Sequence, residues 1–136
     1  MKRLMSIGYT TSAFNIAVFV LRVGTGLLVL LAHGYDKFVK FETLAPKFTN
    51  FLGMGRSLSL GLCVFAEVVC SLFVILGLFT RLACIPLVIN FAVAVAIAHK
   101  YDFLHTGEKA SLFFLIFLTI LFVGPGRVSV DGMLKK

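Results

Sequence analysis

Four long apolar stretches alternate with polar connections along the chain. They occupy residues 13–32, 58–79, 82–98 and 110–123. A transmembrane helix needs roughly 20 mostly apolar residues, with about 17 as the lower limit. The first three stretches meet that length. The fourth can extend back to Thr106, because residues 106–124 hold only two charges near one end, where Lys109 can reach the interface.

The predicted fold class is therefore all-α: a polytopic membrane protein whose four transmembrane helices form a bundle. One domain should cover residues 1–136, with helices at 13–33, 57–79, 82–99 and 106–124. Because Thr80 and Arg81 alone separate the second and third stretches, those two helices must be antiparallel neighbours. Four spans place both termini on one side of the membrane.

The long connection between the first two helices, residues 34–56, alternates aromatic and basic side chains. Its apolar positions recur at steps of three and four residues: Phe38, Phe41, Leu44, Phe48, Phe51 and Leu52. This spacing is typical of an amphipathic segment lying in the membrane interface. We expect such a segment here, bent near Pro46, with a plain loop capping the bundle as the alternative.

Composition and charge agree with a membrane protein. Hydrophobic residues make up 60% of the chain, charged residues 14%, and the mean hydropathy is +1.03, which is far from soluble usage. The net charge of +7 is spread over the loops and termini, so we expect lipid headgroups as its partner and no nucleic acid. The positive-inside rule does not choose an orientation, although Lys2 and Arg3 ahead of the first helix favour cytoplasmic termini.

Three polar side chains fall inside the predicted helices. Counted from the presumed cytoplasmic end of each apolar stretch, Glu67 lies about 18 Å deep, Arg22 about 13–14 Å and Asn90 about 12 Å. A lone charge at mid-membrane costs roughly 2.5–3.5 kcal/mol or more. We therefore expect Arg22 to pair with Glu67, with Asn90 as a third member. Two interpretations of this group remain open. It can be a structural pair that fixes helix register, or a site that binds a polar headgroup or relays a proton.

The cysteines and the helix ends suggest structural roles. Cys63, Glu67 and Cys70 share one helical face, but positions seven apart in a helix are about 10 Å apart, too far for a disulfide. Both cysteines are expected to be packing residues. Arg81 and Arg127 lie beside predicted helix ends, where they can bind terminal carbonyls or headgroups.

A second polar group is expected at the outer membrane face. It contains all three histidines with neighbouring charges: His33, Lys37, His99, Asp102, His105 and Glu108. These are metal-ligand types, yet their spacing matches no strong metal motif, and no metal site is assigned. A polar belt at headgroup level is the simpler interpretation. A metal, haem-edge or quinone-headgroup site is the alternative.

The chain resembles the DoxX family of small four-helix bacterial membrane proteins from about residue 14 to residue 134. The resemblance depends on "RVGTGLLVLLAHGYDK", on Glu67, on "GLFTRLA", on His99 and on the closing "GPGRVSVD". It implies a bacterial cytoplasmic membrane, both termini cytoplasmic, and association with quinone-linked redox partners. The family takes its name from a membrane subunit linked to thiosulfate and quinone oxidation. An extra domain expected of those subunits is not expected in residues 1–136, so thiosulfate oxidation itself is not expected.

Three functions remain open from the sequence. The first is a subunit of a quinone-linked redox system, with quinone as the cofactor and redox proteins or a second copy of the chain as partners. The second is a non-catalytic membrane scaffold, and the third a small-solute or ion pathway. The sequence has no Gly-rich phosphate loop, no CxxC and no spaced Cys/His set, so any oxidoreductase chemistry would need a lipid-soluble cofactor or a partner.

Overall fold

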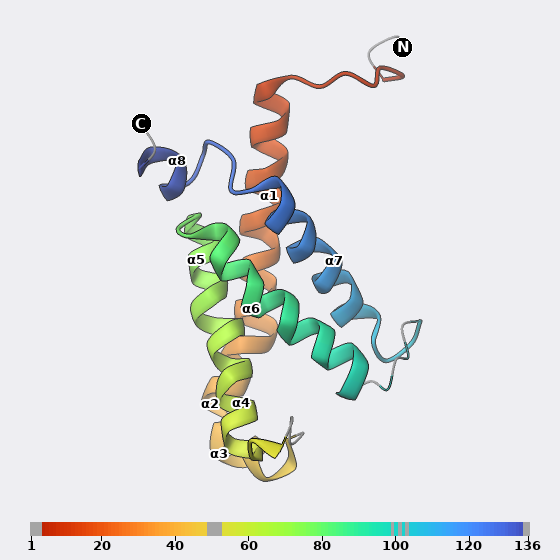
Figure 1. Cartoon of the computed structure of the whole chain (residues 1–136), viewed down its shortest axis with the longest axis vertical. Helices are drawn as coiled ribbons and strands as arrows, with labels where there is room; N and C mark the ends of the chain where they lie inside the picture. The colour runs from red at the N-terminus through yellow and green to blue at the C-terminus, as the bar shows by residue number, and fades with distance from the viewer. Residues whose placement is uncertain (1–3, 49–52, 99, 101, 103, 135–136) are drawn as a thin grey trace.

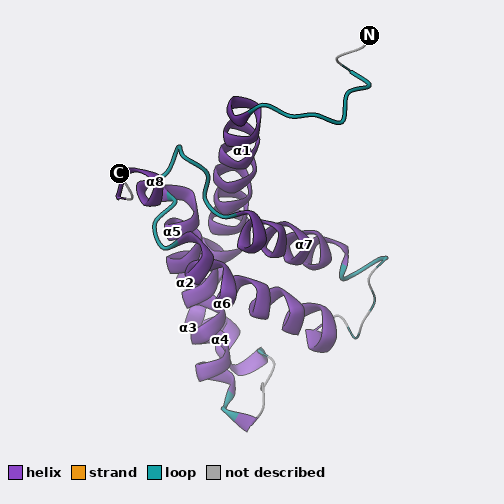
Figure 2. Cartoon of the chain, turned by 45° about the horizontal axis from the view of Figure 1, so that its top comes forward, coloured by secondary structure: helices purple, strands orange, loops and turns teal. Residues whose placement is uncertain are grey.

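The computed structural model describes residues 4–48, 53–98, 100, 102 and 104–134. Within these ranges every regular element is a helix (Figure 2). Helix α1 (Thr11–Val29) continues through a π-helical segment (Leu30–Gly34) into α2 (Tyr35–Val39). It is followed by the short α3 (Phe41–Leu44) and a 3₁₀ turn (Ala45–Lys47).

The second half of the chain contains three further helical rods. The first joins α4 (Arg56–Val64), a π-helical segment (Phe65–Cys70) and α5 (Ser71–Leu76). The second is α6 (Thr80–Val93), which ends in a π-helical segment (Ala94–Ala98). The third is α7 (Glu108–Val123), and the short α8 (Val130–Leu134) follows it.

Three of these rods are long and apolar enough to cross a membrane. They are Thr11–Val39 with 29 residues, Arg56–Leu76 with 21 and Thr80–Ile97 with 18. This confirms an all-helical membrane protein with three candidate spans. Helix α7 is apolar but has 16 residues, shorter than the usual minimum of about 17.

Two pairs of helices build the molecule. Helix α1 packs along α5, and α6 packs along α7. Figure 1 shows α1 and the α4–α5 rod running along the long axis, while α6 and α7 cross them obliquely. Below the tight turn between α5 and α6, both views show α6 diverging from α4 (Figures 1 and 2). The first turns of α1 extend past the rest of the helices.

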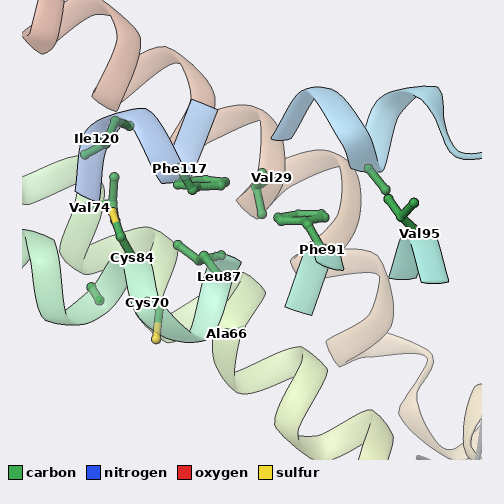
Figure 3. Packing of buried hydrophobic residues seen from close by; sticks show 12 residues of the cluster. Val29, Ala66, Cys70, Val74, Cys84, Leu87, Phe91, Val95, Phe117 and Ile120 are labelled. Carbon is green, nitrogen blue, oxygen red and sulfur yellow. The ribbon is translucent and has the colours of Figure 1, made fainter. Parts of the chain in front are cut away.

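Small side chains and stacked rings fill the core between the pairs (Figure 3). Ala66, Cys70 and Cys84 are all buried, and such small residues let helices approach closely in lipid. The rings of Phe91 and Phe117 stack with centroids 5.9 Å apart and planes 3° apart. The three cysteines are free and buried, which agrees with packing roles.

Glycines set the register between α1 and the rod that packs against it. A Cβ at Gly34 would lie 2.7 Å from the backbone oxygen of Glu67, and a Cβ at Gly26 would lie 3.3 Å from the backbone oxygen of Ser71. These two contacts run antiparallel along the helices. They bring the lower end of the first rod against the middle of the second.

Candidate intramembrane binding site

Glu67 is paired with Lys37. The Lys37 Nζ donates to both carboxylate oxygens at 2.8 Å, and the side chains are 25% and 2% exposed. The expected Arg22–Glu67 pair is therefore wrong. A carboxylate this deeply buried needs a cation, and Lys37, which the sequence analysis assigns to the outer polar group, supplies it.

The error came from the assumed depth of Arg22. Helix α1 starts well beyond the other helices, so Arg22 lies beside Gly77 at the far end of α5. Lys37 lies 15 positions further along the same rod, which at 1.5 Å per residue is about 22 Å away. The Gly34 contact then brings Lys37 level with Glu67.

Two further side chains complete the cluster. Asn90 on α6 donates its Nδ2 to Glu67 Oε1 at 3.0 Å, as expected from the sequence. The Cys63 thiol donates to the same oxygen at 3.4 Å. We call Lys37, Cys63, Glu67 and Asn90 the polar cluster. It joins three separate rods through one carboxylate.

Each of these rods is π-helical beside the polar cluster. Glu67 lies within the segment Phe65–Cys70, Lys37 follows Leu30–Gly34, and Asn90 precedes Ala94–Ala98. A π-helical turn widens the helix and is found frequently at functional sites. Here it occurs at the level where side chains from all three rods converge.

A cavity of about 550 Å³ opens onto the polar cluster. Lys37, Cys63, Glu67 and Asn90 belong to its lining, and nearly all of the remaining lining is apolar: Phe48, Met54, Ser59, Leu62, Phe65, Ala66, Pro86, Ile89, Val93, Ala94 and Ile97. An apolar cavity with a few convergent polar groups is the usual form of a small-molecule site. Its size is typical of such sites.

Arg22 belongs to a second, separate cluster at the opposite end of the rods. Its side chain is 1% exposed, and Nη2 donates to the Val128 carbonyl at 2.7 Å. The guanidinium also lies over the Phe19 ring, 5.6 Å from its centroid. This cluster ties α1 to the segment that follows α7.

Asp131 caps the N-terminus of α6 from a distant part of the chain. Its Oδ1 accepts from the Phe79 N–H at 2.8 Å and its Oδ2 from the Thr80 N–H at 2.9 Å. The Asp131 N–H in turn donates to the Gly77 carbonyl at 2.8 Å. The "GLFTR" and "GRVSVD" segments are therefore one structural unit.

We predict that Asp131→Ala lowers the free energy of unfolding by about 1–2 kcal/mol, since two first-turn N–H groups lose a capping carboxylate. Asp131→Asn keeps one acceptor and should lose about half as much. Thermal unfolding in detergent micelles measures both changes. Equal stability of Asp131→Ala and the parent protein would contradict the capping role.

The helix-end arginines behave differently from each other. Arg81 Nη2 lies 3.4 Å from the Phe122 carbonyl and 3.5 Å from the Val123 carbonyl, at the end of α7. Arg127 contributes its backbone N–H, which donates to Asn15 Oδ1 at 3.0 Å. Of the two arginines, Arg81 is therefore the one whose side chain contacts the terminal carbonyls of α7.

The expected outer polar group is not assembled as one site among the described residues. The His33 ring packs edge-on against Phe113, with centroids 5.4 Å apart. Asp102 and His105 pair at 3.1 Å in an exposed turn, and this hydrogen bond lowers the pKa of Asp102. Glu108 begins α7. His99 lies outside the described residues.

Within the described residues, no group of three His, Cys, Asp or Glu side chains is placed to hold a metal ion. The polar cluster contains one carboxylate that already accepts from Lys37 and Asn90. Its amine and amide are donors suited to carbonyl or hydroxyl oxygens. The described side chains of the polar cluster thus offer hydrogen-bond donors beside one paired carboxylate.

These features define an all-helical membrane protein with a buried polar cluster among its candidate spans. The DoxX family model matches residues 17–100, and the chain belongs to the DoxX family. It is 32% identical over 129 residues to an uncharacterized protein of Haemophilus influenzae, covering 85% of this chain and 89% of that protein. It is also 32% identical over 138 residues to an uncharacterized membrane protein of Mycobacterium tuberculosis, covering 88% and 82% respectively. No solved structure matches the chain.

Proposed function

We propose that this DoxX-family protein binds a lipid-soluble quinone and is a subunit or partner of a quinone-linked membrane redox system. The observation that carries the proposal is the apolar cavity of about 550 Å³ with Lys37, Glu67 and Asn90 in its lining. A quinone combines a long apolar tail with a ring that carries hydrogen-bond acceptors. The apolar lining of the cavity suits the tail, and the N–H groups of Lys37 and Asn90 suit the ring.

The ion pair makes the cluster suitable for a neutral headgroup. Glu67 already neutralises Lys37 at 2.8 Å, so an anionic headgroup would gain little from the lysine charge. Lys37 has a third N–H and Asn90 a second one, and either can donate to a ring carbonyl. Quinone supplies two-electron redox chemistry when bound, while Lys37 and Glu67 are the groups able to hold a proton at the site.

The proposal includes a membrane arrangement. Helix α7 would be the fourth span, extended over residues 106–124. Of the predicted interfacial segment, residues 34–39 continue the first rod and bring Lys37 to the buried Glu67, so the interface would hold the part that follows Val39. The short α3 and the 3₁₀ turn are consistent with a bend there. Both termini would be cytoplasmic, in a bacterial inner membrane. The exposed apolar faces of α1 and α7 leave room for redox partner proteins or a second copy.

A single introduced tryptophan tests quinone binding, because the chain has none of its own. Phe65 lines the cavity and is 49% exposed. We predict that the fluorescence of Phe65→Trp in nanodiscs is quenched saturably by a short-chain ubiquinone. Adding Lys37→Met should weaken the apparent affinity at least tenfold, since the ring loses a charged donor.

Leu72→Trp is the matched control for this measurement. Leu72 lies on α5, is 44% exposed and is not part of the cavity lining. Quinone dissolved in lipid should quench the fluorescence of Leu72→Trp only by collision, so the quenching should rise in proportion to the quinone concentration. If Phe65→Trp shows the same linear quenching, or if Lys37→Met leaves saturation unchanged, the proposal fails.

A membrane scaffold is the second candidate function. The observation in its favour is that Glu67 is already satisfied by protein groups from two other rods, so the cluster can serve to hold helices together. This function predicts linear quenching at both tryptophans. A solute or ion pathway is the third candidate, and α7 supplies little polar lining for one.

A further inference from the structure

The cavity has one side made of half-exposed apolar residues. Leu62, Phe65 and Ile89 all line it, and they are 48%, 49% and 54% exposed. Leu62 and Phe65 come from the α4 rod and Ile89 from α6. In a membrane, exposed apolar side chains in mid-span face lipid tails. This side of the cavity therefore borders the acyl-chain region.

Other parts of the lining come from elsewhere in the chain. Phe48 and Met54, from the connection between the first two rods, also line the cavity. Ala66 and Glu67 form the buried inner wall, with 2% and 1% exposure. The half-exposed apolar residues of the lining come from the α4 rod and from the α6 rod.

The path of α6 fits an opening at this place. Helices α4 and α6 diverge below the α5–α6 turn (Figure 1). Pro86 lies inside α6 and lines the cavity. A proline in a helix interior removes a backbone hydrogen bond and clashes with the preceding turn, which bends the helix.

We infer that the cavity is loaded sideways from the bilayer, through a portal between α4 and α6 whose edges are Leu62, Phe65 and Ile89. The occupant is an amphiphile already dissolved in the membrane, which brings its uncharged headgroup to Lys37 and Asn90 and leaves its tail at the portal. The inference names the route to the proposed quinone site, and so rests on the proposed function for its physiological ligand.

Cys63 is a built-in reporter of this route. Its thiol lines the cavity and is hydrogen-bonded to Glu67, whereas Cys70 and Cys84 are buried in the core outside the lining. A maleimide adds the thiol sulfur across its double bond, and the thiol proton ends on the adjacent carbon. Glu67 is placed to accept that proton in transit.

The experiment treats the full chain in nanodiscs with N-phenylmaleimide, which partitions into lipid, or with a charged methanethiosulfonate, and locates the modification by peptide mass spectrometry. We expect N-phenylmaleimide to modify Cys63 at least tenfold faster than Cys70 or Cys84, and the charged reagent to leave Cys63 unmodified. Rapid modification by the charged reagent would show an aqueous entrance and overturn the portal. So would equal modification of all three cysteines.

Paired substitutions locate the entrance. Ile89→Trp fills one edge, and Ile85→Trp, one turn earlier on α6 at a 43% exposed position outside the lining, is its control. We expect Ile89→Trp to slow Cys63 modification at least tenfold and Ile85→Trp to leave it unchanged. If Ile89→Trp does not fold, Leu62→Trp replaces it with Leu58→Trp as control. Unchanged modification in the edge variant would overturn the inference.

Modification of Cys63 does not require quinone binding, so the two proposals can fail separately. Lateral access to Cys63 without saturable quinone quenching would retain the portal and reject quinone as the ligand. Saturable quenching together with access of the charged reagent would retain the quinone and reject the lateral route.

Discussion

Glu67→Gln should lower the free energy of unfolding by about 3 kcal/mol, measured by thermal unfolding in detergent micelles. The substitution leaves Lys37 as an uncompensated ammonium inside the cluster. Breaking one partner of a buried ion pair typically costs about 3–5 kcal/mol. The lower end applies here, since the Lys37 side chain is 25% exposed and retains part of its hydration.

The reciprocal and double variants show whether the loss comes from the pair. Lys37→Met strands the carboxylate, which is 2% exposed, and should cost at least as much as Glu67→Gln. Combining Lys37→Met with Glu67→Leu replaces the pair by apolar groups and should recover most of the loss. If the double variant loses the sum of the losses measured for Lys37→Met and Glu67→Leu separately, the groups are not energetically coupled and the pairing is wrong.

Cys63→Ala and Cys70→Ala are the companion controls. Cys63 contributes one long thiol hydrogen bond of 3.4 Å to Glu67, and Cys70 contributes packing alone. We expect each to change stability by about 1 kcal/mol or less, because each removes a single small side-chain atom. If Cys63→Ala lost as much stability as Glu67→Gln, the Cys63 thiol would be the group that stabilises the cluster, and not the Glu67 carboxylate.

The helices could be predicted from sequence because they depend on local composition. Runs of apolar residues of sufficient length predict membrane spans whatever lies beside them. The helix stop predicted at Gly124-Pro125-Gly126 agrees with the end of α7 at Val123, because a helix stop also depends on local sequence. The hydrogen bond between Asn90 and Glu67 was also within reach, because α5 and α6 are joined by a tight turn that fixes their relative depth.

The partner of Glu67 could not be predicted by counting depth from the presumed cytoplasmic end of each apolar stretch. The rod that begins with α1 has 29 residues, more than one span needs, so hydropathy does not say which part crosses the bilayer. The missed signal was the pair Gly26 and Gly34. Small residues mark close helix contacts, and their contacts with Ser71 and Glu67 define the register that brings Lys37 to the carboxylate.

The π-helical segments and the cavity were beyond sequence reasoning for a different reason. A π-helical turn forms where packing of neighbouring helices outweighs the preference for regular α-helical hydrogen bonding, and no residue type in these segments specifies it. The cavity depends on the divergence of α6 from α4. Both the π-helical segments and the cavity depend on how the rods pack together. The sequence does single out three of the residues that line the cavity, Glu67, Asn90 and Cys63.

Gly77→Ala should lower the free energy of unfolding by about 3 kcal/mol, because the turn between α5 and α6 has no room for a Cβ. Gly77 has φ +74°, and an added Cβ would lie 2.0 Å from Arg22 Nη1 and 2.3 Å from Ser129 Cβ. A left-handed conformation costs an alanine roughly 1–2 kcal/mol. Overpacking against buried neighbours adds about 1–3 kcal/mol.

Gly53→Ala separates these two costs in the same protein. Gly53 has nearly the same backbone angle, φ +73°, and among the described residues nothing lies within 4 Å of its added Cβ. It should therefore lose only the conformational part, about 1 kcal/mol. The excess loss in Gly77→Ala measures the contact with Arg22 and the segment after α7. Equal losses at the two glycines would mean that Arg22 moves aside freely, and that the second cluster does not hold α1 in register.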